Sequence, residues 1–125
     1  MALEEFVGAI VMEVDGREIE VVSVSPTINT GRRLVKTMNR SGNAAGFSRG
    51  VTQYELRVTA VIPKSGEPID WENIEGAKIT LSPITAGGQR VSYLDCFSTQ
   101  VGRQYEVENE ARVDIQMNAL RKVEE

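Results

Sequence analysis

Apolar and polar residues alternate with a period of two along most of the chain, a pattern typical of half-buried β-strands. The clearest run, residues 51–62, predicts a strand whose apolar face consists of Tyr54, Leu56, Val58, Ala60 and Ile62. The polar face of the same strand consists of Gln53, Glu55, Arg57 and Thr59. Residues 111–119 alternate in the same way, which favours a strand over a helix there, although helix-forming residues are frequent in 108–122. Shorter runs predict further strands in residues 78–84 and 89–99.

An Asp15-Gly16 pair lies between two apolar runs near the start of the chain and predicts a tight β-hairpin. This dipeptide suits a two-residue type I′ turn, because both central positions of that turn need positive φ. The register set by such a turn pairs Val14 with Arg17, Glu13 with Glu18, Met12 with Ile19 and Ile10 with Val21.

One short helix is expected in residues 68–76, with Asp70 as its N-cap and Gly76 as its stop. The whole pattern therefore predicts a mainly β fold of six or seven strands and one short helix, in a single domain over residues 1–125. The last residues, 122–125, are expected to form a frayed acidic tail. Long strands with one polar face leave hydrogen-bonding edges in an open sheet, and pairing with other copies of the chain would satisfy them.

The charged residues are unevenly distributed along the chain, which carries 14 basic and 18 acidic residues and a formal net charge of −4. No acidic residue occurs between Glu20 and Glu55, whereas this segment holds five cations: Arg32, Arg33, Lys36, Arg40 and Arg49. Residues 29–50, which are also rich in glycine, are expected to form an extended basic arm. Such an arm is suited to attract a polyanion or an acidic surface of another copy, and charge alone does not distinguish these partners from a merely polar loop.

The residue types most often used in catalysis are scarce. The chain has no histidine and a single cysteine, Cys96, which excludes His-based triads, an internal disulfide and Cys-based zinc sites. The alternating acids Glu106, Glu108 and Glu110 suit a divalent cation, arginines of a neighbouring copy or a plain solvated edge. We therefore predict no catalytic, metal or cofactor site and a protein that is not an enzyme.

Neither a signal peptide nor a membrane span is expected. Glu4 and Glu5 occupy the N-terminal region in which a signal peptide carries basic residues. The longest uncharged stretch, residues 21–31, is too short and too polar to cross a bilayer. We therefore expect a protein that does not follow the general secretory route and has no membrane partner.

Six segments along the chain occur in the order found in one protein family. They are Glu5–Gly16, Thr30–Asn39, Gly46–Leu56, Asp70–Ile79, Tyr93–Phe97 and Tyr105–Arg112. Taken together, these segments resemble the tail tube proteins of long-tailed phages, of the Mu-like and lambda-like type. That family is related to the haemolysin-coregulated tube protein of type VI secretion. The resemblance covers nearly the whole chain.

This resemblance implies a β-sandwich or partial barrel with one short helix. It also implies that six copies form a ring, in which the inner sheets complete a barrel, and that rings stack into a tail tube for DNA ejection. The implied partners are other copies of the chain, the tape-measure protein and passing DNA in the lumen, and tail terminator, baseplate or tip, and sheath proteins. The implied location is the virion tail, with assembly in the host cytoplasm, and no cofactor is implied.

Within this picture, two groups of residues have expected roles. The subunit or ring interface is expected to include Arg32, Arg33, Lys36, Arg40, Phe47, Arg49, Glu106, Glu108 and Glu110. The lumen is expected to be lined by Gln53, Glu55, Arg57 and Thr59. Two other functions remain open: a DNA-binding β module that uses the basic arm 29–50, and a single-ring tail terminator or secretion-tube component.

Overall fold

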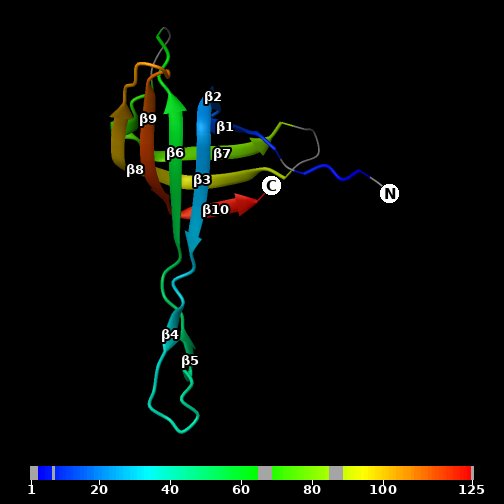
Figure 1. Ribbon diagram of the computed structural model, residues 1–125, viewed down its shortest axis with the longest axis vertical. Helices are drawn as coiled ribbons and strands as arrows, with labels where there is room; N and C mark the ends of the chain where they lie inside the picture. Colours follow the sequence, from blue (N-terminus) through cyan, green and yellow to red (C-terminus); the bar gives the residue numbers. More distant parts are fainter. Residues whose placement is uncertain (1–2, 7, 65–68, 85–88, 125) are drawn as a thin grey trace.

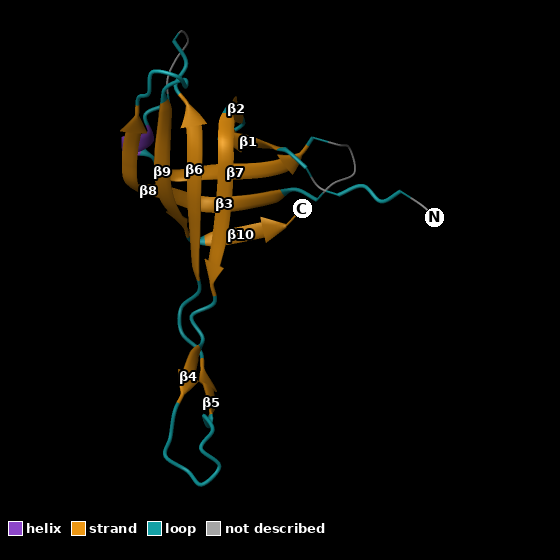
Figure 2. Cartoon of the chain, in the orientation of Figure 1, coloured by secondary structure: helices purple, strands orange, loops and turns teal. Residues whose placement is uncertain are grey.

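The computed structural model describes residues 3–6, 8–64, 69–84 and 89–124 and confirms the predicted mainly β fold (Figure 1, Figure 2). The described residues form ten strands and one turn of 3-10 helix, η1 (Trp71–Asn73). The strands, in chain order, are β1 (Ile10–Val14), β2 (Arg17–Ile19), β3 (Val21–Asn29), β4 (Arg33–Val35), β5 (Gly46–Ser48), β6 (Gln53–Val61), β7 (Glu75–Pro83), β8 (Val91–Gln104), β9 (Arg112–Ala119) and β10 (Arg121–Glu124).

Eight strands belong to one antiparallel sheet, in the order β2-β1-β7-β8-β9-β6-β3, with β10 paired to β8. Strands β4 and β5 form a separate two-stranded sheet. In Figure 1, β3, β6 and β9 run along the long axis of the molecule, whereas β7 and β10 cross them in a second layer. The large sheet therefore folds over on itself as a partial barrel, and the core lies between its two layers.

Strand β8 connects the two layers because it bends near its middle. Its first half pairs with β7 and β10, and its second half pairs with β9. At the bend Asp95 has a φ of +56°. Between the pairs Tyr93–Ile79 and Cys96–Ala77, β8 advances by three residues while β7 advances by two. This bulge interrupts the strict alternation expected for the strand, so that Tyr93 and Cys96 are both buried.

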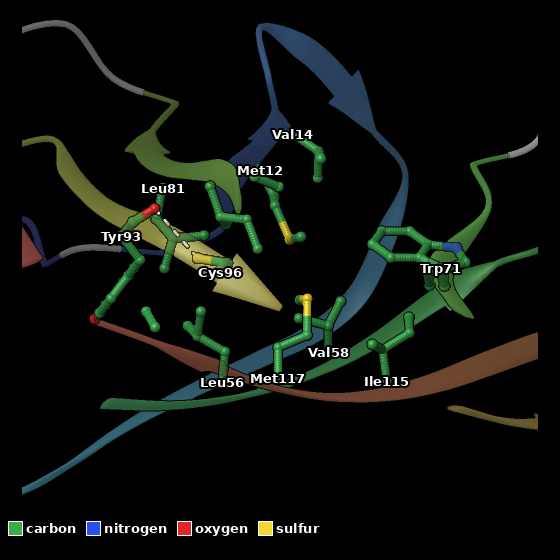
Figure 3. Close-up of a cluster of buried hydrophobic side chains, with 14 of the residues drawn as sticks. Met12, Val14, Leu56, Val58, Trp71, Leu81, Tyr93, Cys96, Ile115 and Met117 are labelled. Atoms are coloured by element: carbon green, nitrogen blue, oxygen red, sulfur yellow. Dashed lines mark hydrogen bonds between the residues drawn. The ribbon is translucent and has the colours of Figure 1, made fainter. Parts of the chain in front are cut away.

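The core is made by the inward faces of both layers. Figure 3 shows side chains of β6 and β9 meeting those of β1, β7 and β8, with Trp71 of η1 at one end. The alternation predicted for the two longest patterned segments is confirmed, because every second residue from Leu56 in β6 and from Val113 in β9 is buried: Leu56, Val58, Ala60, Val113, Ile115, Met117 and Ala119. Tyr54 is partly buried.

The predicted hairpin between β1 and β2 is confirmed, with positive φ at both turn residues. Three of the four expected pairs form: Val14–Arg17, Glu13–Glu18 and Met12–Ile19. The fourth expected pair, Ile10 with Val21, is wrong. Ile10 pairs with Pro83 of β7, whereas Val21 begins β3 and pairs with Ala60 of β6. The chain leaves the hairpin here because its next apolar residues contribute to the other layer.

The helix expected in residues 68–76, of which residue 68 lies outside the described part, is reduced to the single turn η1. Asp70 occupies the N-cap position but makes no capping hydrogen bond through its side chain. Gly76 does not stop a helix; it lies within β7 with a φ of +77°. Pairing between β7 and β8 begins at Glu75, so the backbone is committed to the sheet after one helical turn.

The frayed tail expected in residues 122–125 is wrong for the residues that the structure describes, which continue as β10. The strand pairs with the first half of β8, from Arg121–Leu94 to Glu124–Val91. This half of β8 offers an edge, and the tail completes it. Residue 125 lies outside the described residues. Short strands such as β10 and β2 also explain why the strand number exceeds the expected six or seven, since three or four residues carry too little alternation to detect.

Candidate assembly surfaces

The predicted arm is a β-hairpin that extends from the ends of β3 and β6, away from the body of the subunit (Figure 1). Its strands β4 and β5 place Leu34 directly opposite Phe47. At its neck, Gly31 has a φ of +76°, and a Cβ added there would overlap the carbonyl oxygen of Val51. A Cβ on Gly50 would lie 2.7 Å from the carbonyl oxygen of Gly31. The neck therefore needs glycine at both positions to bring its two segments this close.

Asn39 organises the tip of the arm. Its side-chain amide donates to the carbonyl oxygen of Asn43 at 2.9 Å. Its side-chain oxygen accepts from Ser41 Oγ at 2.7 Å and from the backbone N–H of Gly42 at 3.1 Å. These local bonds define the turn without burying any side chain, so the arm depends on its hairpin pairs and not on a core of its own.

The arm is both basic and apolar. Its five cations, Arg32, Arg33, Lys36, Arg40 and Arg49, are exposed. No ion pair among the described residues involves any of them. Arg49 lies over the ring of Phe47, with 5.5 Å from the guanidinium carbon to the ring centroid, and Leu34 is 64% exposed. A single subunit thus presents uncompensated positive charge and apolar side chains on one projection, which is typical of an interaction surface.

The three acids expected at the interface lie on the loop between β8 and β9, residues 105–111, and not on a strand. Glu110 pairs with Arg112 at 3.1 Å. Its own backbone N–H and Arg112 hold the pKa of Glu110 below the usual value. Glu106 accepts hydrogen bonds from two neighbouring side-chain amides, whereas Glu108 has no such partner among the described residues. All three carboxylates are exposed to solvent.

The arm and this acidic loop lie at opposite ends of the subunit (Figure 1). The arm leaves the sheet where Asn29 of β3 pairs with Gln53 of β6. The loop enters β9 where Arg112 pairs with Val61, at the far end of β6. One copy therefore does not bring the predicted cations and acids together, whereas a head-to-tail arrangement of two copies would.

A polar face covers the layer of β3, β6, β9 and the second half of β8, on the side away from the core. The four residues expected to line the lumen lie on it, alternating with the buried residues of β6. Thr59 donates to Asp114 at 2.8 Å, Gln116 donates to Glu55, and Arg57 Nε lies 3.4 Å from Glu55. The register extends this face onto β3, whose role the sequence analysis missed although its polar residues alternate: Ser23, Ser25, Thr27 and Asn29.

Two edges of the same layer have no partner strand within the described residues. Strand β3 pairs only with β6, and residues 99–104 of β8 pair only with β9. Strand directions alternate along β8-β9-β6-β3, so β3 of one copy beside β8 of another would continue the antiparallel pattern. Unpaired edges of this kind are templates for a strand from another chain.

An apolar cavity of about 270 Å³ opens at the loop end of the subunit, beside η1. Its lining combines apolar and charged residues, among them Ile19, Ile62, Ile69, Trp71, Arg17, Glu18, Glu20 and Arg103. Arg103 pairs with Glu72 at 2.9 Å, and the hydrogen bond to Glu72 raises the pKa of Arg103. The sequence analysis missed this cavity because its walls come from segments far apart in the chain.

The acidic and cysteine side chains of the described ranges are the candidates for metal binding and nucleophilic chemistry. No group of three or more acidic or cysteine side chains there is placed to hold a metal ion. The thiol of Cys96 is buried and donates to the carbonyl oxygen of Tyr93 at 3.2 Å. Burial raises the pKa of Cys96 to about 11, so the thiol stays protonated at neutral pH and is a poor nucleophile. None of the helical structure in these ranges has the length and hydropathy of a membrane span.

Comparison with known proteins connects the fold to one group of structures, although no protein-family model and no curated protein matches the chain. The sheath/tube terminator of the extracellular contractile injection system PVC, in its extended state, aligns with a TM-score of 0.74 and 20% identity over 99% of each chain. The SPP1 tail tube aligns with a TM-score of 0.68 and 9% identity, over 92% of this chain and 74% of its own. Hcp1 from Flavobacterium johnsoniae aligns with a TM-score of 0.61 and 12% identity, over 95% of this chain and 94% of its own.

At these identities the likeness is one of fold. It agrees with the resemblance read from the order of the sequence segments, and it includes both the tail tube and the Hcp branches of that resemblance. The chain therefore has the fold shared by a phage tail tube, a tube terminator of a contractile injection system and Hcp1.

Proposed function

We propose that the chain is a structural tube protein of a phage tail, whose copies form hexameric rings that stack into a conduit for DNA ejection. The observation that carries this proposal is a four-strand layer with an apolar face covered by the core, a polar outer face and two unpaired edges. A wide cylinder of identical copies satisfies all three features, because the edges join between copies and a polar lumen face needs no apolar cover.

Ring closure joins β3 of each copy to residues 99–104 of β8 in the next copy. The alternating strand directions make this junction antiparallel, like every other pair in the sheet. Six copies are the number that the sequence resemblance implies. In such a ring Gln53, Glu55, Arg57 and Thr59 line the lumen, through which the tape-measure protein and then DNA pass.

Stacking joins the basic arm of one ring to the acidic loop of the next ring. The cations Arg32, Arg33, Lys36, Arg40 and Arg49 lie at one end of the subunit, together with Phe47. The acids Glu106, Glu108 and Glu110 lie at the other end. A contact between two different ends does not close on itself, so it repeats from ring to ring and builds a filament.

The remaining partners follow from a tube that has two ends and an outer wall. A tail terminator meets one end, a baseplate or tip meets the other, and a sheath covers the wall in a contractile tail. The protein acts in the virion tail after assembly in the host cytoplasm. Its role is architectural, with no catalysis and no cofactor.

The test of this function is polymerisation of a variant with the charge reversed at two of the five arm cations, Arg32→Glu with Arg33→Glu. We expect the wild-type protein to form tubes in negative-stain electron microscopy at high concentration. The double variant is expected to form rings or free subunits only. Its thermal unfolding should stay close to wild type, because both residues are exposed and unpaired within the described chain. Tubes of normal length from the variant would contradict the stacking contact.

A second variant, Glu106→Lys with Glu108→Lys, complements the first, and the mixture of the two serves as the control. It reverses the charge at the other end of the subunit, so it too should fail to form tubes on its own. Where rings of the two variants alternate, mixing restores opposite charges at the four substituted positions of each junction, and tubes should reappear. Failure of the mixture, with both variants folded, would place the arm against another surface.

The lumen assignment is tested by thiol labelling of Gln53→Cys, since native Cys96 is buried. In assembled tubes the new thiol should react with a small maleimide but not with a long poly(ethylene glycol) maleimide. The control Glu124→Cys, on exposed β10 in the other layer, should react with both reagents. Equal labelling of Gln53→Cys by the long reagent in tubes and in free subunits would exclude this face from the lumen.

A single-ring terminator is the second candidate, because the PVC tube terminator aligns with the chain over 99% of both proteins. A terminator would form rings that never grow into tubes at any concentration. The basic arm also suits a DNA-binding module, which predicts salt-dependent binding of DNA by the free subunit. The tube protein is expected to show little such binding.

A further inference from the structure

The apolar cavity beside η1 is a candidate acceptor for another copy of the chain. It has a volume of about 270 Å³ and lies at the loop end of the subunit. Ile62 and Ile69 remain partly exposed in it, although both pack against the core. Apolar residues that stay open to solvent around an aromatic floor, here Trp71, are typical of a docking site for an apolar anchor.

The arm carries an apolar anchor of matching character. Leu34 and Phe47 lie directly opposite each other in the hairpin and are 64% and 59% exposed. Arg32 and Lys36 flank β4 directly, two positions on either side of Leu34, and Arg49 stacks on Phe47. We name this Leu34–Phe47 pair, with its flanking cations, the knob. No acidic residue occurs in the arm, so the knob is apolar at its centre and positive around it.

We propose that the knob of one copy inserts into the Trp71 cavity of the next copy along the stack. The inference rests on the proposed function, and it names the acceptor that the arm contacts. The knob and the cavity lie at opposite ends of the subunit, which is the arrangement that an endlessly repeating contact needs.

Charge favours the same pairing. The lining of the cavity is balanced in charge, since Glu18 and Glu20 lie there with Arg17 and Arg103. The negative part of the rim is the acidic loop with Glu106 and Glu108 at the same end of the subunit. The arm that approaches carries only positive charge, so the rim and the knob attract each other and fix the orientation of the contact. Burial of Phe47 and Leu34 against Trp71 then supplies an apolar centre within a charged rim.

A second groove serves as the internal comparison. It is lined by Ile74, Phe97 and Leu120 among other residues, and carries three acids, Glu72, Glu75 and Asp95. Two of these acids already pair with arginines of their own subunit. The groove extends from Glu72 of η1 to Leu120 directly after β9 and shares no lining residue with the cavity, so it offers a distinct acceptor position for the test.

Disulfide trapping between copies tests the contact. A Phe47→Cys variant is mixed with an Ile69→Cys variant, assembled and oxidised, and cross-linked dimers are scored on a denaturing gel. The comparison mixture pairs Phe47→Cys with Leu120→Cys, which places the acceptor thiol in the second groove. We expect dimers from the first mixture and not from the second. Native Cys96 does not interfere because it is buried.

Alanine substitution tests the apolar part of the contact separately from the charge. Leu34→Ala with Phe47→Ala keeps every cation of the arm, and should raise the critical concentration for tube formation about tenfold or more. The matched control, Val35→Ala with Ser48→Ala, changes the other face of the same hairpin and should leave that concentration nearly unchanged.

The outcomes separate this inference from the proposed function. Wild-type tubes with cross-links to Leu120→Cys, or with no cross-link to Ile69→Cys, would overturn the cavity contact and leave the tube function intact. Equal effects of the two alanine pairs would also overturn it. Wild-type protein that forms neither rings nor tubes would overturn both.

Discussion

A single residue sets the shape of this subunit at the bend of β8. Asp95 adopts a φ of +56° and adds the extra residue that bends β8 from one layer into the other. Its carboxylate accepts from Arg121 at 2.9 Å, which ties the bend to the start of β10. Beside it, Cys96 turns into the core. A local departure from ideal strand geometry therefore decides how the whole sheet folds over.

The buried thiol of Cys96 makes the free energy of unfolding depend on pH in the alkaline range. Its pKa is raised by burial from 9.0 to about 11 in the folded protein. The unfolded chain therefore releases this proton first as the pH rises. The contribution of the thiol to stability is complete below pH 9 and is lost between about pH 9 and pH 11, by about 2 kcal/mol.

The measurement is urea unfolding from pH 7 to pH 11 for wild type and Cys96→Ala. The pKa of Tyr93 is also raised, mainly by burial and in smaller part by Cys96, so the comparison reports the thiol together with its influence on Tyr93. We expect the alanine variant to lose less stability between pH 9 and pH 11. Parallel pH profiles for the two proteins would show that the thiol does not carry the effect.

At the scale of elements, the arm is a hairpin with a glycine neck, and its direction depends on that neck. Gly31 and Gly50 approach each other's segments too closely for a Cβ. The tip has its own hydrogen bonds around Asn39, and β4 and β5 pair over three residues. The hairpin can thus keep its shape while a change at the neck alters where it points.

Replacing Gly31 by alanine should therefore impair assembly more than folding. The positive φ costs about 1–2 kcal/mol for a residue with a Cβ, and the contact with Val51 must also open. We expect faster amide exchange in residues 30–52, unchanged protection of β6 and β9, and loss of tubes in electron microscopy.

The control for this change is Gly46→Ala in β5, where an added Cβ has no heavy atom within 4 Å. It should assemble like wild type. Normal tubes from Gly31→Ala, with unchanged exchange at the neck, would show that the arm tolerates another direction.

At the scale of the molecule, charge is separated along the long axis. The basic arm lies at one end, and the acidic loop of residues 105–111 lies at the other. The polar face between the ends is mixed in sign, since Glu55 contacts Arg57. Ring closure through strand edges and stacking through charged ends are therefore different interactions, and they should respond differently to solution conditions.

Salt should separate these two interactions. The screening length falls from about 10 Å at 0.1 M to about 3 Å at 1 M, which weakens exposed charge pairs far more than backbone pairing between strand edges. We expect tubes to shorten into rings as sodium chloride rises, with unchanged circular dichroism, as followed by sedimentation and electron microscopy. Dissociation of rings before tubes shorten would reverse this assignment.

Much of this protein could be predicted from neighbouring residues along the chain. Alternation identified β6 and β9 with their buried faces, and Asp15-Gly16 predicted the hairpin register up to Met12–Ile19. The absence of acids between Glu20 and Glu55 marked the arm. These features depend on the period of the side chains, the chemistry of the turn and the charge. All three are local properties of the sequence and do not depend on contacts with distant segments.

The remaining features required contacts between distant segments. The bulge at Asp95 forms against β7, β10 forms because β8 leaves an edge open, and η1 stops after one turn because β7 starts pairing. The separation of arm and acidic loop follows from the direction in which β6 and β9 pair, and the Trp71 cavity from five segments meeting at one end. Pairing between strands that lie far apart in the sequence decides these features. The edge of a strand offers the same backbone hydrogen-bonding groups to any segment that reaches it, so the residue pattern does not identify the partner strand.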